Sequence, residues 1–205
     1  MTQSHFPNSL LSPTKGTLSV DGDIALQHLV QVPIDHALIL GGARSGKSRF
    51  AECLARSRGH SLVYVATGEA HDDEMAERIA RHRTDRRQDW HTVEVPINLP
   101  AAIADVSRGD TVVLVDCLTL WLSNIMLADN DVEKATTDLL TALAEANGPV
   151  LMVANEVGLG IVPENALARR FRDEAGRMNQ RLAAHVPHVA FISAGLPMWL
   201  KGSFE

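Results

Sequence analysis

Residues 41–48, with the sequence Gly-Gly-Ala-Arg-Ser-Gly-Lys-Ser, constrain this chain more than any other segment. They fit the phosphate-loop pattern G-x-x-x-x-G-K-[ST], in which Gly41 and Gly46 are the outer glycines. Apolar residues at 37–40 predict a buried strand before the loop, and residues 48–56 predict a helix after it. This order aims backbone N–H groups and a helix N-terminus at phosphates. We therefore expect a nucleoside triphosphate as ligand. The context disfavours the alternative, a glycine-rich helix cap that binds nothing.

Five residues of the loop each have an expected contact. Gly41, Gly42 and Gly46 let the backbone approach the β- and γ-phosphates of the nucleotide. Lys47 contributes a positive charge to the same oxygens, and the Ser48 hydroxyl is suited to bind Mg²⁺.

Apolar strands and amphipathic helices alternate along the rest of the chain. We expect strands at 61–66, 111–116, 149–154 and 188–193, with 188–193 the last and 92–95 a short edge strand. Helices are expected at 72–84, 99–106, 118–127, 132–146 and 164–185. Such alternation predicts an α/β fold with a mainly parallel sheet covered on both faces, here a RecA-like phosphate-loop NTPase.

The N-terminal residues differ from this pattern. Residues 1–22 are rich in Ser, Thr, Pro, Gly and Asn, which favours a flexible arm. Residues 24–32 fit either an extra strand or a short helix. We therefore expect residues 1–35 to be an N-terminal extension and residues 36–205 to be a single domain.

Composition excludes several classes of protein. A net charge of −6 argues against a nucleic-acid partner, which usually requires a basic excess. We expect no membrane span, because no run of 18 apolar residues occurs. The N-terminus lacks the basic and apolar regions of a secretory signal. Cys53 and Cys117 are too few for a disulfide framework, so both are expected to be buried reduced thiols in a cytoplasmic protein.

Candidate ligand-binding residues follow the expected strands. In a parallel sheet, ligands bind beyond the carboxyl ends of the strands, where Asp116 and Glu156 lie. Asp116 suits a metal or nucleotide contact, and the alternative is a cap for the helix starting at 118. Glu156 could bind metal, act as a base or accept hydrogen bonds from loop amides.

Residues 71–83 form a second informative segment. Asp72 and Asp73 suit a helix N-terminus, so a structural role is as well supported as a functional one. His82 lies among arginines that would favour neutral imidazole and attract phosphate. Alternatively, these arginines form a solvated helix face paired with Glu74 and Glu77.

Four motifs together carry a specific resemblance. They are Gly-Gly-Ala-Arg-Ser-Gly-Lys-Ser-Arg at 41–49, Asp-Asp-Glu-Met at 72–75, Arg-Ile-x-x-His-Arg at 78–83 and Asn-Glu-Val-Gly-x-Gly-Ile-Val-Pro-Glu at 155–164. In order and spacing the chain resembles, from about residue 37 to 201, the bifunctional adenosylcobinamide kinase/adenosylcobinamide-phosphate guanylyltransferase family of cobalamin biosynthesis. The first 35 residues lie outside this family core.

The resemblance implies two reactions. ATP or GTP would phosphorylate the hydroxyl of adenosylcobinamide. GTP would then donate GMP to adenosylcobinamide-phosphate, giving adenosylcobinamide-GDP and pyrophosphate. His82 would carry GMP covalently, which divides one difficult displacement into two easier ones.

The resemblance also implies a set of GTP contacts, Mg²⁺ and a homo-oligomer, for which a trimer is one candidate. Glu94 and Asp116 could each accept hydrogen bonds from guanine or ribose, or serve the metal. Two alternative functions remain: a small-molecule kinase without nucleotidyl transfer, and a regulator driven by triphosphate hydrolysis. The implied contacts are Gly41, Gly42, Ala43, Arg44, Ser45, Gly46, Lys47, Ser48, Ala66, Thr67, Gly68, Arg83, Thr84, Asp85, Arg86, Glu94 and Asp116.

Overall fold

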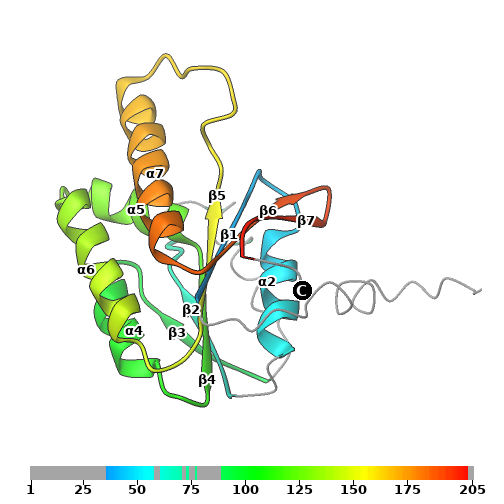
Figure 1. Cartoon of the computed structure of the whole chain (residues 1–205). Helices are drawn as coiled ribbons and strands as arrows, with labels where there is room; N and C mark the ends of the chain where they lie inside the picture. Colours follow the sequence, from blue (N-terminus) through cyan, green and yellow to red (C-terminus); the bar gives the residue numbers. More distant parts are fainter. Residues whose placement is uncertain (1–35, 58–60, 71–72, 74–76, 78–88, 203–205) are drawn as a thin grey trace, which may run out of the picture.

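A seven-stranded sheet forms the centre of the molecule in a computed structural model, which describes residues 36–57, 61–70, 73, 77 and 89–202. The strand order is β3-β2-β4-β5-β1-β6-β7 (Figure 1). The strands are β1 (His36–Gly41), β2 (Ser61–Ala66), β3 (Trp90–Glu94), β4 (Thr111–Asp116), β5 (Val150–Asn155), β6 (His188–Ser193) and β7 (Leu196–Lys201).

The strands from β3 to β6 in this order are parallel, and β7 pairs with β6 in the antiparallel sense. The central strands β1, β4 and β5 are buried along almost their whole length. Strands covered on both faces need near-continuous apolar sequences, which explains why these segments lack alternation.

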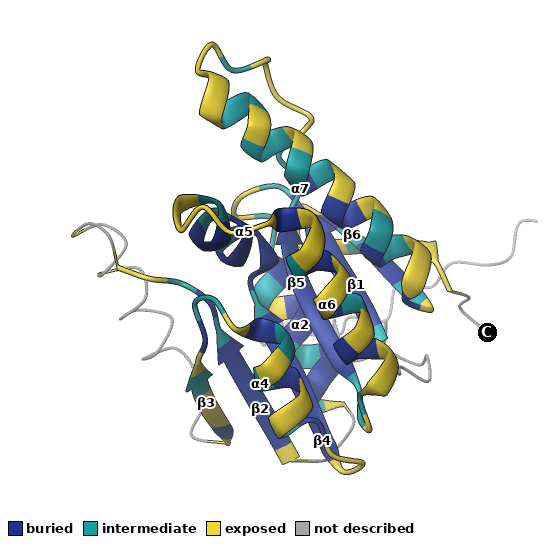
Figure 2. Cartoon of the chain, turned by 90° about the vertical axis from the view of Figure 1, so that its left-hand side faces the viewer, coloured by how far each residue is buried: buried dark blue, intermediate teal, exposed yellow. Residues whose placement is uncertain are grey.

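Helices cover both faces of the sheet (Figure 1). One face packs against α2 (Lys47–Arg56), whose Phe50, Ala51 and Leu54 join apolar residues of the strands. Figure 2 shows the central strands in dark blue between the helices, whereas β3 and the first turns of α7 are mostly exposed or half-buried. The opposite face packs against α4 (Leu99–Val106), α5 (Leu118–Leu127), α6 (Val132–Glu145) and α7 (Ala166–His185).

The expected mainly parallel α/β fold is confirmed, and β3 is the predicted edge strand. The prediction that 188–193 is the last strand is wrong, because β7 follows after a turn at Ala194 and Gly195. Pro197 lacks an N–H and weakens the strand signal, but an edge strand tolerates proline. Helix α7 begins at Ala166 rather than 164, because the Asn165 side chain caps it by accepting from the N–H groups of Leu167 and Ala168.

The remaining expectations concern the N-terminal extension, the helix at 72–84, the two cysteines and a membrane span. The predictions for residues 1–35 and most of the predicted helix at 72–84 lie outside the described residues. Both cysteines are free, but Cys53 is only half-buried because its position on α2 falls beside, rather than on, the core-facing stripe. No helix in the described part of the chain is long and apolar enough to cross a membrane.

The core predicts a clear contrast between two leucines. Leu38 on β1 is fully buried, whereas Leu127 at the end of α5 is 63% exposed. Leu38→Ala should lower the free energy of unfolding by about 2–5 kcal/mol, because it leaves a cavity between sheet and helices. Leu127→Ala should change it by less than about 0.5 kcal/mol. Urea unfolding followed by circular dichroism measures both, and equal losses would contradict this assignment of the core.

Candidate functional site

The parallel register brings the carboxyl ends of the strands to one edge of the sheet. Glu94, Ala66 and Asp116 lie side by side across β3, β2 and β4. Gly41 at the end of β1 pairs with Asn155 at the end of β5. This edge therefore collects most of the described residues that the sequence singled out, although they are far apart along the chain.

Two glycines of the phosphate loop are required by its geometry. Gly41 has φ +153°, and a Cβ there would collide with the backbone carbonyl of Ile192 on β6. Gly46 has φ +97°, and its Cβ would lie 3.2 Å from Gly195 Cα in the β6–β7 turn. The Gly195 N–H donates to the Ser45 carbonyl at 2.9 Å. The β6–β7 turn thus supports the loop from behind.

The sequence alone does not predict this support, because it does not predict β7. The signal available was Ala194-Gly195 directly after an apolar strand, which is typical of a turn. Ala194 and Gly195 both have positive φ, of 51° and 80°.

The first turn of α2 is open to an anion. Its N-cap is Gly46, which has no capping side chain, and no acidic residue lies in the first turn. The N–H groups of the first turn point out of the helix end, and together with the helix dipole they favour negative charge at this point. Ser48 is the second residue of the helix.

Lys47 is folded back onto the loop. Its Nζ donates to the Gly42 carbonyl at 2.6 Å, and the residue is only 7% exposed. The lysine charge is therefore held inside the loop that would surround a phosphate.

Asp116 ends β4 and is half-buried. Its Oδ2 accepts a hydrogen bond from the Tyr64 hydroxyl at 2.9 Å. The alternative cap role is not supported, because the N-cap of α5 is Cys117 and no side chain caps that helix. Burial, together with the charge of Asp116, raises the pKa of the Cys117 thiol to about 11, so this thiol stays neutral.

Thr67 ties two loops of the edge together. It is fully buried, its hydroxyl donates to the Cys117 carbonyl at 2.7 Å, and it accepts from the Cys117 N–H at 2.9 Å. The Asn124 amide donates to the carbonyls of Thr67 and Pro96. The Thr67 side chain is therefore fully engaged by the backbone after β4, while Ala66 and Gly68 on either side are half-buried.

Glu156 has a local partner. Its Oε1 accepts from the Gly158 N–H at 2.6 Å, while its own N–H donates to the Gly41 carbonyl at 3.0 Å. Of the three roles considered for this side chain, the contact with a loop amide is the one present. Residues 156–165 then project beyond the sheet before α7 begins (Figure 1).

Several predicted site residues lie outside the described part of the chain. These are His82, Arg83, Thr84, Asp85 and Arg86, together with the neighbouring Asp72. Glu94 is described and exposed. Among the described residues, no group of three or more His, Cys, Asp or Glu side chains could hold a metal ion.

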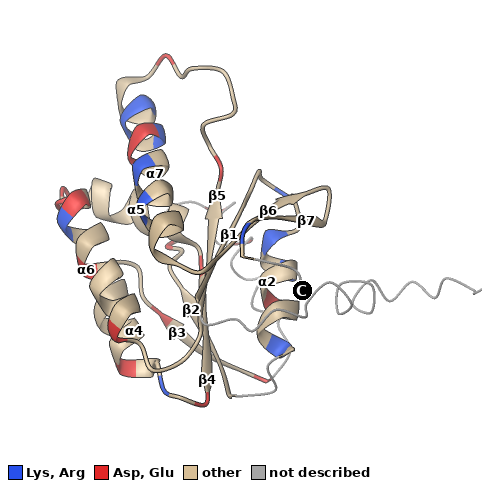
Figure 3. Cartoon of the chain, in the orientation of Figure 1, with Lys and Arg blue, Asp and Glu red and all other residues tan. Residues whose placement is uncertain are grey.

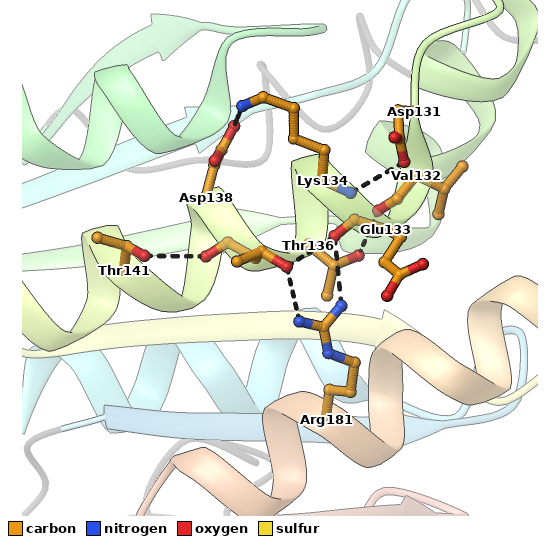
Figure 4. Close-up of polar contacts among 9 residues, drawn as sticks. Asp131, Val132, Glu133, Lys134, Thr136, Asp138, Thr141 and Arg181 are labelled. Carbon is orange, nitrogen blue, oxygen red and sulfur yellow. Dashed lines mark hydrogen bonds and ion pairs between the residues drawn. The ribbon is translucent and has the colours of Figure 1, made fainter.

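A cavity of about 620 Å³ lies elsewhere, between the α5–α6 connection and α7, and none of the candidate residues lines it. Arg181 connects α7 to α6 beside this cavity, because its guanidinium donates to the Glu133 carbonyl and to Thr137 Oγ1 (Figure 4). Figure 3 marks further Lys and Arg positions in blue along α7 and at both ends of α2.

One protein-family model matches most of this sequence. A family model described as cobinamide kinase / cobinamide phosphate guanyltransferase matches residues 37–200. The chain belongs to this family. The match confirms the resemblance that the four motifs indicated, and it includes every candidate site residue.

Curated relatives carry names that agree with the family. The chain is 48% identical over 167 residues to the bifunctional adenosylcobalamin biosynthesis protein CobP of Pseudomonas aeruginosa, covering 80% of this chain and 96% of the relative. It is 41% identical over 179 residues to CobU of Salmonella typhimurium, covering 80% of this chain and 98% of that protein.

A solved structure supports the fold alone. An ATPase from the type III secretion system of pathogenic bacteria superimposes with a TM-score of 0.54 at 14% identity, over 85% of this chain and 60% of that one. This agrees with the predicted phosphate-loop NTPase fold.

The contacts of Thr67 generate a test of its role. Thr67→Val keeps the shape but leaves the buried backbone groups of Cys117 without partners, so the free energy of unfolding should fall by about 1–3 kcal/mol. Thr67→Ser keeps the hydroxyl and should retain most of the stability. Urea unfolding measures both variants. A Thr67→Val protein of normal stability but weakened GTP binding would instead indicate a direct contact with the nucleotide.

Proposed function

We propose that this protein phosphorylates adenosylcobinamide with ATP or GTP and then transfers GMP from GTP to adenosylcobinamide-phosphate, releasing pyrophosphate. The supporting observation is a phosphate loop with an open helix N-terminus, in a chain of which residues 37–200 match the family. The product of the second reaction is adenosylcobinamide-GDP.

In the kinase step the loop would hold the triphosphate. Backbone N–H groups of residues 41–48 would bind the β- and γ-phosphates at the N-terminus of α2. Lys47 would exchange the Gly42 carbonyl for a phosphate oxygen, which develops negative charge as the γ-phosphoryl group leaves. The buried Ser45 hydroxyl, without a partner among the described residues, fits a site completed by a phosphate acceptor.

The donor set also fits Mg²⁺. This ion is usually held by one or two protein oxygens together with substrate phosphates and water, so no dedicated cluster is needed. Asp116 and Ser48 would hold it, since β4 is separated from β1 by only one strand, about 10 Å at ordinary strand spacing. When bound, the ion neutralises phosphate charge.

Glu94 suits a different part of the nucleotide. It lies on β3, four strand spacings from β1, which is about 19 Å. A side chain at that distance would not reach a metal held at the loop. We therefore propose that Glu94 accepts hydrogen bonds from the guanine or ribose, while Asp116 serves the metal.

In the transfer step His82 would attack the α-phosphorus of GTP. A nitrogen–phosphorus bond forms, and the bond to the pyrophosphate leaving group breaks. A phosphate oxygen of adenosylcobinamide-phosphate then attacks the same phosphorus, and the bond to His82 breaks. This role of His82, and nucleotide contacts by residues 83–86, rest on the family resemblance.

The chain would act as a homo-oligomer, with a trimer as one candidate. Large exposed apolar side chains, which association would cover, support this proposal. They are Leu159, Ile161, Val162 and Leu167 around the loop before α7, and Leu196, Met198 and Leu200 on β7. We also propose a cytoplasmic location, because both cysteines are free thiols and the curated relatives are biosynthetic enzymes.

Lys47→Ala tests the shared phosphate site. Removal of the charge should reduce both phosphorylation and GMP transfer by about 100-fold or more. In each reaction the group that leaves, a nucleoside diphosphate or pyrophosphate, gains negative charge on oxygens that Lys47 would stabilise. Initial rates with cobinamide and with cobinamide phosphate measure the two steps separately. Lys134→Ala, an exposed lysine paired with Asp138, is the matched control and should leave both rates unchanged. Survival of either reaction in Lys47→Ala would contradict a single triphosphate site.

His82→Ala separates the two reactions. The variant should lose GMP transfer and the acid-labile guanylyl adduct, yet keep substantial phosphorylation. Intact mass after mixing with GTP and Mg²⁺, followed by peptide mapping, measures the adduct. His91→Ala, a change to an exposed histidine on β3, should still form it. Wild-type protein that phosphorylates cobinamide but never forms an adduct would support the alternative of a kinase without nucleotidyl transfer.

A further inference from the structure

The only tyrosine of the chain contacts the carboxylate that ends β4. Tyr64 is 3% exposed on β2, and its hydroxyl donates to Asp116 Oδ2 at 2.9 Å. The two residues are 52 positions apart in sequence. The described residues give no partner to Asp116 Oδ1, so the carboxylate has one oxygen fixed and one available.

The sheet register explains how the two side chains meet. Tyr64 pairs with Leu114, and Ala66 pairs with Asp116. Because side chains alternate along a strand, Tyr64, Leu114 and Asp116 share one face. Tyr64 and Leu114 belong to the core that packs against α2, the helix that carries Lys47 and Ser48. Asp116 therefore projects on the same side of the sheet as the phosphate loop's helix.

The tyrosine ring is itself firmly placed. It packs edge-to-face on Trp90 of β3, with ring centroids 5.8 Å apart and planes at 87°. The Arg56 guanidinium lies 5.6 Å from the centroid of the Trp90 ring and pairs with Asp89. The phenol thus belongs to a packed wall formed by β2, β3 and the end of α2.

A fixed donor matters for this carboxylate because the torsional energy of an aspartate has only broad minima for rotation about its last side-chain bond. Without a partner, the orientation of the two oxygens is therefore weakly defined. A hydrogen bond from a hydroxyl to a carboxylate oxygen is directional and stronger than one between neutral groups. Residues that orient a metal-binding carboxylate in this way strongly influence metal affinity.

We propose that Tyr64 is a positioning residue that orients Asp116 so that Oδ1 is directed to the metal of the bound nucleotide. The inference rests on the proposed function, in which Asp116 and Ser48 hold Mg²⁺. Tyr64 would touch neither nucleotide nor metal, and would act only through Asp116.

The test is the metal-dependent part of nucleotide affinity. Calorimetric titration with a non-hydrolysable GTP analogue gives one Kd with Mg²⁺ and another with EDTA. Tyr64→Phe keeps the ring and its packing but removes the hydroxyl. The ratio of the two affinities should fall by about tenfold, while affinity in EDTA stays at the wild-type value.

Two further variants make the outcomes distinguishable. Trp90→Phe disturbs the same wall without removing a hydrogen bond, since Trp90 Nε1 has no partner among the described residues, and its affinity ratio should match wild type. An unchanged ratio in Tyr64→Phe, whatever its thermal stability, would overturn the inference. If Asp116→Asn abolishes the Mg²⁺ effect while Tyr64→Phe does not, only the positioning role fails. If Asp116→Asn leaves the ratio unchanged, the proposed metal role of Asp116 fails.

Discussion

The parallel register from β3 to β1 is the constraint on which the candidate site depends. It brings Glu94, Ala66, Asp116 and Gly41 to the same edge of the sheet, although they come from four separate strands. A shift of one residue would move a strand's side chains to its other face. Such a shift of β4 would separate Asp116 from Tyr64 and direct it away from α2.

Buried polar contacts fix the loops that leave this edge. The Thr67 hydroxyl forms hydrogen bonds with both the N–H and the carbonyl of Cys117. The Gly195 N–H donates to the Ser45 carbonyl. The backbone of the phosphate loop and of the loop after β4 is thus held in place by other parts of the protein. Groups held in advance need little reorganisation as charge develops during a reaction, which favours phosphoryl transfer.

Fold and family contribute different information about function. The phosphate-loop fold is shared with an ATPase of 14% identity, and a shared fold does not fix a reaction. The assignment of the substrates depends instead on motifs beyond the loop, including those at 72–83 and 155–164. Within the second of these, Glu156 closes a local turn with Gly158, so this part of the motif also shapes the loop.

The sequence by itself determined the phosphate loop, the parallel α/β fold and most element positions. These depend on local signals: glycines next to a lysine, unbroken apolar strands and helical periodicity. It did not determine β7, whose signal is weakened by Pro197, or the depth at which Thr67 is buried. Only the tertiary structure decided that the β6–β7 turn supports the loop and that Tyr64 meets Asp116. The physical reason is that such contacts depend on strand order and register, which bring together residues that no local pattern connects.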